Sequence, residues 1–452
     1  MAAGFLDGDD GTSGMNGDAT GPVAKNVRRI AHMDIPGGGQ IVAAGGYAYI
    51  GHMAPPHGTS ILDVSDPQHP RVIASIALHD DRSHSHKVRV TGDLMITNSE
   101  RWHRSGAGRA TAIPDATALL ETRLGRAPDD RELAREIGVE VGDVPALRDY
   151  LERGGYRDGG FRIYDISDRT NPKELAFRKT FGKGVHRFDC DEKYAYISTE
   201  MEGFVGNILV IYDITRPERP EEVSRWWIEG QNKGAGEAPD WEGTHIRLHH
   251  ALRSGDTMWA GCWGGGVAAI DVSDIANPRT VGAYDYHPAF AAVSHTFMKV
   301  PFPIDGRDIA LAIDEEGRRH VKGRFHAFLW VFDVTEPSDM RPLSTYHVSE
   351  AASPWTASSI AAGERFGAHQ FREKMDDTFV YATWFAGGLR IVDIADPLHP
   401  REAGFFIPEP GPGETRVAGG SAVQSNDVDV DERGLIYLID RLNGLDILEF
   451  TP

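Results

Sequence analysis

The sequence ILDVSDPQHP (residues 61–70) decides the fold, because versions of it recur along the whole chain. Each copy is a short alternating apolar run that ends in an acidic residue, and most copies continue through a polar turn to Pro. Alternation predicts a β-strand, and the Asp side chain can close a turn behind it. Short strands repeated at this interval are typical of propeller blades. The copies are ILDVSDPQHP (61–70), IYDISDRTNP (163–172), IYDITRPERP (211–220), AIDVSDIANP (269–278), VFDVTEPSDM (331–340), IVDIADPLHP (391–400) and the shortened ILEFTP (447–452).

This repeat resembles the LVIVD repeat family, and the resemblance extends from Val27 to Pro452. The resemblance implies a propeller in which each copy is the third strand of a four-stranded blade. The last copy has no fourth strand behind it, but VRRIAHMDIP (27–36) has a fourth-strand pattern. We therefore expect an all-β fold, a seven-bladed β-propeller closed by the N-terminal strand, because closure removes an exposed sheet edge.

One insertion interrupts the repeat, since Asp63 and Asp165 lie 102 residues apart where the other gaps run from 48 to 62. The insertion covers residues 106–156, has apolar residues at helical spacing, and offers Asp129 or Asp130 as a helix cap. The sequence predicts a short helical insertion after the second strand of blade 2. We expect one domain over residues 27–452 and a disordered, Gly/Asp-rich tail over residues 1–26.

Charge and composition exclude several classes of protein. The formal net charge of -20 opposes binding to nucleic acid. The N-terminus lacks the basic and apolar regions of a signal peptide, and no apolar run is long enough to span a membrane. Cys190 and Cys262 are far apart, so neither a disulfide framework nor a zinc ribbon is indicated. These features favour a cytoplasmic protein without nucleic-acid or membrane partners.

A set of histidines appears when the blades are aligned on their innermost strand. Residues at the start of that strand would meet at one mouth of the central channel. Gln40 and Asn426 hold this position in blades 1 and 7, so the fold itself does not demand histidine. Inter-blade hydrogen bonding is the structural alternative to metal binding. The histidines at this position in blades 2 to 6 are His86, His186, His249, His295 and His369.

Carboxylates are predicted beside the imidazoles, because the second strand of each blade ends at the same mouth. Glu100, Glu200 and Asp314 are the candidates. A metal-bound histidine usually donates its second N–H to a carboxylate or carbonyl, and such groups would orient the ring. Imidazole ligands suit iron, copper, zinc or nickel better than calcium or magnesium. Among these metals, we expect iron or copper rather than zinc.

The predicted arrangement is similar in architecture to that of the carotenoid-cleavage oxygenases, propellers that hold iron by four histidines. It is also similar to the His-rich propellers of selenium-binding protein or methanethiol oxidase. The local sequence motifs of those families are absent from this chain. With five candidate ligands, one histidine is surplus, and the sequence leaves open which one.

The preferred function is a metal-dependent oxidase or oxygenase that acts on a small organic substrate at the channel mouth. A metal-dependent hydrolase or lyase is one alternative, because the same site could lower the pKa of a bound water. A non-catalytic scaffold that binds a ligand or protein is the other. The helical insertion is a candidate contact for a homo-oligomer or a lid.

Overall fold

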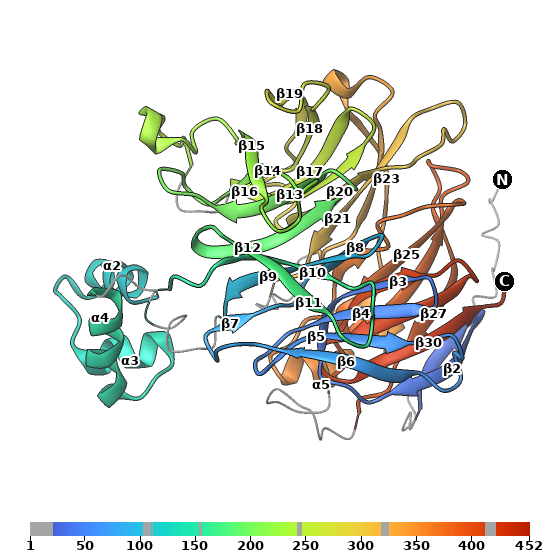
Figure 1. Cartoon of the computed structure of the whole chain (residues 1–452), viewed down its shortest axis with the longest axis horizontal. Helices are drawn as coiled ribbons and strands as arrows, with labels where there is room; N and C mark the ends of the chain where they lie inside the picture. The colour runs from blue at the N-terminus through green and yellow to red at the C-terminus, as the bar shows by residue number, and fades with distance from the viewer. Residues whose placement is uncertain are drawn as a thin grey trace, which may run out of the picture.

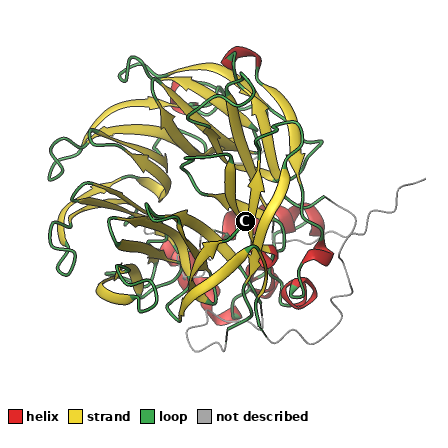
Figure 2. Cartoon of the chain, turned by 90° about the vertical axis from the view of Figure 1, so that its right-hand side faces the viewer, coloured by secondary structure: helices red, strands yellow, loops and turns green. Residues whose placement is uncertain are grey.

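The computed structural model describes residues 21–102, 110, 112–152, 156–241, 246–317, 325–411 and 422–452. The described chain is built from curled antiparallel sheets that fan around a common centre, with three helices projecting from one side (Figures 1 and 2). The all-β class expected from the sequence is confirmed. No helix of the described residues is long and apolar enough to cross a membrane.

The strands follow one another in antiparallel sets of four, and we number the sets along the chain. They are set 1, β3 (Gly38–Ala44), β4 (Tyr47–His52), β5 (His57–Asp63) and β6 (Arg71–Ala77); set 2, β8 (Val88–Thr91), β9 (Leu94–Arg101), β10 (Gly160–Asp165) and β11 (Lys173–Lys179), with β7 (Ser83–His84) also on β9; set 3, β12 (Phe181–Cys190), β13 (Tyr194–Glu200), β14 (Asn207–Asp213) and β15 (Glu221–Trp226); set 4, β16 (Ile246–Ser254), β17 (Thr257–Trp263), β18 (Val267–Asp271) and β19 (Arg279–Tyr284); set 5, β20 (Val293–Lys299), β21 (Ile309–Glu315), β22 (Leu329–Asp333) and β23 (Arg341–Tyr346); set 6, β24 (Ala368–Phe371), β25 (Phe379–Trp384), β26 (Gly388–Asp393) and β27 (Arg401–Ile407); set 7, β28 (Ser425–Val430), β29 (Leu435–Asp440), β30 (Gly444–Phe450) and β2 (Val27–Met33).

The repeated Asp closes the turn that the sequence predicts after each third strand. Asp63 Oδ1 accepts from the backbone N–H of Ser65 at 3.0 Å, and Asp271 Oδ1 does the same for Ser273 at 2.9 Å. The carboxylate thus replaces a backbone acceptor and ends the strand at the same point in the six copies that have Asp. The carboxylates that accept the equivalent bond from the backbone N–H two residues later are those of Asp165, Asp213, Asp333 and Asp393.

The N-terminal segment is more ordered than the predicted tail of residues 1–26. β1 (Val23–Lys25) pairs with β27, and β2 pairs with β30 near the end of the chain. The tail prediction is therefore wrong for its last residues, because the backbone of Val23–Lys25 pairs with the edge strand β27 and covers that edge. Residues 1–20 lie outside the described part.

The helices of the insertion lie between β9 and β10, as the sequence predicts (Figure 1). Asp129 caps the middle helix, with its side chain accepting from the N–H of Glu132 and the Glu132 side chain accepting from Asp129. The bounds are α2 (Ile113–Leu124), α3 (Asp130–Ile137) and α4 (Val144–Glu152), with α5 (Thr356–Ala361) between β23 and β24 and short 3-10 turns at Val141–Asp143, Lys233–Ala235, Pro337–Asp339, Glu350–Ala352 and Phe385–Gly387.

A bulge near the start of the first strand shapes the centre of the molecule. In set 3 the pairing shifts between Val185 and Arg187, so that His186 is the extra residue. A bulge lets two consecutive side chains avoid the usual alternation of faces. The same shift falls at Gly39, His295, His369 and Asn426, and between Ile246 and His250.

Candidate metal centre

The five predicted histidines lie in a row of neighbouring imidazoles. The ring centroids are 5.4 Å apart for His86 and His186, 4.8 Å for His186 and His249, 4.1 Å for His249 and His295, and 4.4 Å for His295 and His369. All are buried except His186, whose side chain is 23% exposed. The structure therefore brings together side chains that are 283 residues apart at the extremes, because each starts the first strand of a different set.

The register corrects the residue predicted for blade 1. The bulge position there is Gly39, whereas Gln40 pairs with Gly51 one step further along the strand. A Cβ on Gly39 would lie 2.7 Å from Cβ of His86, so this position has no room for a side chain. The row of imidazoles is thus bounded by Gly39 on one side and by Asn426, as predicted, on the other.

The carboxylate prediction contains a one-residue slip at Asp314, which the sequence alignment places level with Glu100 and Glu200. Gly38, Ser294, Ala368 and Ser425, which precede the bulges, pair with His52, Asp314, Trp384 and Asp440, whereas Val185 pairs with Thr199. The residue before Glu200 thus corresponds to His52, Asp314, Trp384 and Asp440. In these sets the equivalent of Glu100 and Glu200 is therefore the next residue along the chain, which is Glu315 in set 5. A one-residue slip turns a side chain to the other face of a sheet. The corrected positions, which we call the cap ring, are Met53, Glu100, Glu200, Trp263, Glu315, Phe385 and Arg441.

Members of the cap ring contact the imidazoles. The indole of Trp263 stacks on His249 with centroids 4.9 Å apart, and Phe385 lies 4.8 Å from His369. Glu315 lies 3.9 Å from Nε2 of His295 and 4.0 Å from Nε2 of His369.

The three predicted carboxylates have different hydrogen-bond partners. Glu100 accepts from Nδ1 of His186 at 2.9 Å, so its orienting role has a structural basis. Glu200 instead accepts from the backbone N–H of Lys183 at 2.7 Å. Asp314 accepts from Tyr286 at 2.7 Å and from Trp330 at 3.0 Å, on the face turned away from the imidazoles. No bond to a predicted histidine is recorded for Asp314 among the described residues, and the adjacent Glu315 occupies the place predicted for it.

The hydrogen bonds of Nδ1 decide which ring nitrogen of His249 and His369 carries the proton. Nδ1 of His249 lies 2.7 Å from the carbonyl oxygen of His295, and Nδ1 of His369 lies 2.5 Å from that of Asn426. A carbonyl only accepts, so both Nδ1 atoms are donors. Burial lowers the pKa of both imidazoles well below the usual value, so both are neutral. Nε2 of each ring is therefore left as a lone pair.

His295 reaches the same state through a longer chain of bonds. Nε2 of Gln370 donates to Phe371 and Glu373, which turns its Oε1 towards Thr296. The Thr296 hydroxyl donates to that oxygen at 2.7 Å, and its lone pair lies 2.9 Å from Nδ1 of His295. Nδ1 must then supply the proton of this bond. Nε2 of His295 is a third lone pair.

His186 completes the group from the neighbouring set. Its Nδ1 faces Glu100, and its Nε2 lies 2.9 Å from Nε2 of His249. Two nitrogens at about 2.0–2.1 Å from one metal and at right angles lie about 2.9 Å apart. Burial raises the pKa of Glu100, but the charge and hydrogen bonds of His186 and His84 outweigh burial and hold this pKa well below its usual range. The ionised Glu100 can hold the proton of His186 on Nδ1.

His86 is in the opposite state. Oδ1 of Asn98 accepts from Lys87, and Nδ2 of Asn98 donates to the carbonyl of Val185, both at 2.9 Å, which fixes the amide. The remaining N–H of Asn98 faces Nδ1 of His86 at 3.3 Å. Nδ1 of His86 is therefore an acceptor, and Nε2 carries the proton of the neutral ring. His84 stacks on His86 with centroids 4.2 Å apart and contacts Glu100 at 2.9 Å.

Two groups of the described residues have the spacing to hold a metal ion. They are His84, His86 and Glu100, and His249, His295 and Glu315. The sequence analysis missed His84 and Glu315. His84 could have been found because it lies two residues before His86, on the same face of an extended segment. Glu315 was not predicted because of the one-residue slip at Asp314.

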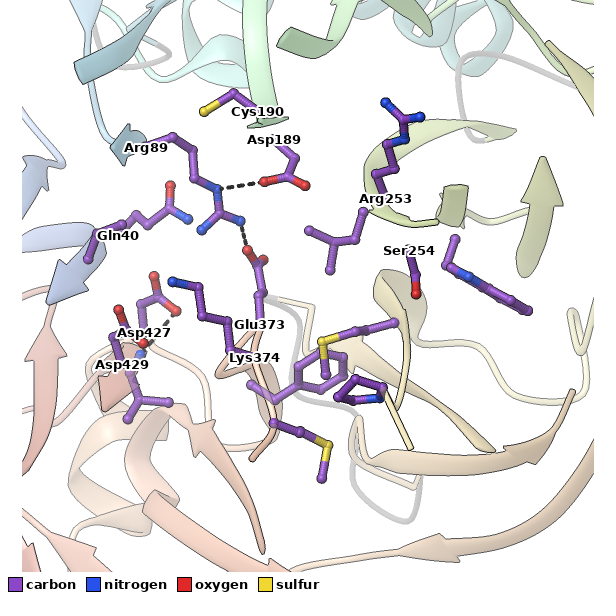
Figure 3. A pocket seen from close by; sticks show the side chains of 18 of the residues that line it. Gln40, Arg89, Asp189, Cys190, Arg253, Ser254, Glu373, Lys374, Asp427 and Asp429 are labelled. Carbon is purple, nitrogen blue, oxygen red and sulfur yellow. Dashed lines mark hydrogen bonds and ion pairs between the residues drawn. The ribbon is translucent and has the colours of Figure 1, made fainter. Parts of the chain in front are cut away.

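A cavity of about 480 Å³ lies at the other end of the first strands. Figure 3 shows Arg89 between Asp189 and Glu373, with Lys374 beside Asp427 and Asp429. Glu373 also bonds Gln370 at 2.6 Å, so hydrogen bonds run from His295 to the cavity wall. The charged groups that line this cavity are largely paired with one another, whereas the Nε2 atoms of three of the imidazoles are left as lone pairs.

Comparisons with known proteins bear on the fold alone. Residues 38–77 and 376–406 match the LVIVD repeat model. The solved structure titled "Structure of U3-55K" has 8% identity and a TM-score of 0.53 over 94% of this chain and 98% of that chain. A periplasmic gluconolactonase of Pseudomonas aeruginosa has 11% identity and a TM-score of 0.52 over 86% of this chain and 87% of that one. A search of the curated proteins finds no match. The chain thus contains LVIVD-type repeats at these two regions and has a propeller-like, all-β fold.

Proposed function

We propose that this chain is a metal-dependent enzyme whose transition metal is held by Nε2 of His186, His249, His295 and His369. The observation that carries the proposal is the arrangement of protons: each of these four rings has Nδ1 committed to an acceptor. Metal-bound histidines in proteins are oriented in this way. His86 is then the surplus histidine, since its Nδ1 accepts from Asn98.

Glu315 supplies negative charge on the side opposite Glu100. Burial raises its pKa, but the positive charges of Arg365 and Arg441 outweigh burial, so that the pKa of Glu315 is lowered. Its oxygens lie within 4.0 Å of two Nε2 lone pairs, too far for hydrogen bonds and close enough to share a cation with them. Lone pairs and a carboxylate that face one another in a buried site repel unless a cation lies between them.

Iron or copper is the metal we propose, because imidazole-rich sites suit these metals and an open position supports oxidase or oxygenase chemistry. When bound, such a metal would activate dioxygen beside a small organic substrate. The chain itself contributes the fixed tautomers, the orientation of His186 by Glu100, and the exclusion of water by Trp263 and Phe385, which cover His249 and His369.

We further propose that the strand sets are seven blades of one closed ring. Support comes from the pairing of β2 with β30, whose register runs from Val27 opposite Phe450 to Met33 opposite Leu445. Additional support comes from the contacts between neighbouring sets, such as Glu100 opposite Gly184. Deleting Val27–Pro36 would then abolish folding, and the circular dichroism of that variant tests it.

The experiment for the enzyme proposal is elemental analysis of purified protein, followed by oxygen-uptake assays with a panel of small organic compounds. We expect about one equivalent of iron or copper per chain, and oxygen uptake that disappears with the metal. Absence of any transition metal after reconstitution would overturn the proposal and leave a binding propeller. Bound metal with turnover that does not need oxygen would favour a hydrolase or lyase, the class named in the gluconolactonase neighbour.

A further inference from the structure

Three arginines stack on the aromatic side chains of the cap ring, just outside the imidazoles. Arg247 lies 4.7 Å from the ring of Trp263, Arg365 lies 4.0 Å from that of Phe385, and Arg441 lies 5.1 Å from the latter. Guanidinium groups stack in this way on aromatic faces. Three guanidinium groups are thus gathered beside the three carboxylates of the cap ring, in a chain whose formal net charge is -20.

The carboxylates of the cap ring already have partners. Glu315 pairs with Arg365 at 2.5 Å, Glu200 faces Lys183 Nζ at 3.6 Å, and Glu100 is bonded to His186. The charges of Glu100, Glu200 and Glu315 also attract Arg247, but among the described residues none of the three forms a direct ion pair with it.

Arg247 is the exception among these cations. Within the part of the chain that the structure describes, its guanidinium forms no ion pair, and its Nε is buried without a hydrogen-bond partner. An arginine guanidinium keeps its charge inside proteins. A buried N–H without a hydrogen-bond partner costs free energy, so a guanidinium that keeps one is suited to an anion from outside.

The position of Arg247 is fixed by its neighbours. Ile246, the residue before it, pairs with Trp263, and Arg247 precedes His249 by two residues on β16. Gly206 leaves room for its stem, since a Cβ there would lie 3.0 Å from Cβ of Arg247. The stack of Arg247 on Trp263 and of Trp263 on His249 places one free guanidinium beside the proposed metal ligands.

We propose that the substrate of the metal centre is a small organic carboxylate, and that Arg247 binds its carboxylate group. The planar guanidinium matches a carboxylate in two parallel hydrogen bonds, which a neutral amide or alcohol cannot reproduce. This inference rests on the proposed function, since it names the substrate class of that site. It makes Arg247 a specificity-determining residue that binds the substrate away from the metal.

Calorimetric titration of the metal-loaded protein with three probes tests the inference: benzoate, its neutral counterpart benzamide, and phenyl phosphate. We expect the wild type to bind benzoate at least about tenfold more tightly than benzamide, and Arg247→Gln to lose this preference with its metal content unchanged. Arg247→Lys should retain part of it. Arg162→Gln is the matched control, because Arg162 also stacks on an aromatic ring, 4.3 Å from Phe177, but lies on β10 and stacks on no member of the cap ring.

Three outcomes would overturn the inference: no preference for benzoate over benzamide in the wild type, an unchanged preference in folded Arg247→Gln and Arg247→Lys, or tighter binding of phenyl phosphate than of benzoate. Elemental analysis of the same samples separates this failure from that of the proposed function. Protein with metal and without carboxylate preference contradicts only the substrate class, whereas protein without metal contradicts the enzyme itself.

Discussion

The two ends of the imidazole row contain similar residues and differ in their protons. At one end, Glu100 lies among His84, His86 and His186, and two of these rings bond it directly. At the other end, Glu315 lies 3.9 Å from His295 and is bonded to Arg365 instead. The carboxylate of Glu100 is thus hydrogen-bonded to the imidazoles beside it. At the Glu315 end, by contrast, the Nε2 atoms of the imidazoles are lone pairs that face the carboxylate.

This difference teaches that residue type and proximity are not enough to identify a metal ligand. Both ends have two histidines and a carboxylate with suitable spacing. The backbone carbonyls of His295 and Asn426 and the hydroxyl of Thr296 distinguish them, because they hold Nδ1–H and leave Nε2 free. These partners come from neighbouring strands, and a list of ligand residues would not include them.

The largest expected effect comes from removing ligands at one end only. His249→Ala/His295→Ala should lose the metal altogether, from about one equivalent to less than about a tenth. His84→Ala/His86→Ala, the matched double variant at the Glu100 end, should keep most of it. Elemental analysis of both proteins after the same reconstitution checks this, and equal losses would contradict the distinction between the ends.

Thr296→Val tests whether the tautomer of His295 matters. The variant keeps the shape of the side chain and removes the hydroxyl that accepts from Nδ1. We expect metal affinity to fall about 10–100-fold, as for other partners of metal-bound histidines. Competition with a chelator measures the affinity, and Thr296→Ser is the control that should restore it. An affinity equal to that of the wild type would show that Thr296 does not set the tautomer.

His52 is a buried histidine whose two ring nitrogens are both used within the protein. Nδ1 lies 2.9 Å from the carbonyl of Pro36, and Nε2 lies 2.8 Å from the Ser60 hydroxyl. Burial lowers the pKa of His52 to about 4, below the unfolded value of 6.5. The stability linked to this neutral ring is complete above pH 6.5 and is lost as pH falls towards 4, because only the unfolded chain takes up the proton.

His52→Gln should therefore lose less stability than the wild type between pH 7 and pH 5, by about 2 kcal/mol. Urea unfolding at the two pH values measures the difference, and metal content should not change. An identical loss in both proteins would mean that His52 titrates normally in the folded state.

The smallest effect is expected for His86→Gln. If His86 is the surplus histidine, its replacement should change metal affinity by less than about threefold, because Nε2 of His86 carries a proton and does not face the metal as a lone pair. Chelator competition checks this beside His186→Gln, which should lose far more. A loss as large as that of His186→Gln would restore His86 to the ligand set.

Errors in the sequence interpretation arose where alternation of faces was interrupted. Gln40 was predicted in place of Gly39, and Asp314 in place of Glu315, each by one residue. The bulge inserts a residue that no periodic pattern records, and every later side chain in the alignment then changes face. Glu100 was placed well because its alignment with Glu200 was correct.

The sequence by itself determined the β-class, the repeat, the position of the helical insertion and the five histidines that meet, since repeated strands put equivalent residues in equivalent places. Only the tertiary structure decided which imidazoles have a free Nε2, because the acceptors of Nδ1 come from carbonyls and side chains that folding brings together. Sequence records which side chains are present, but the position of a proton depends on the atom that lies opposite it.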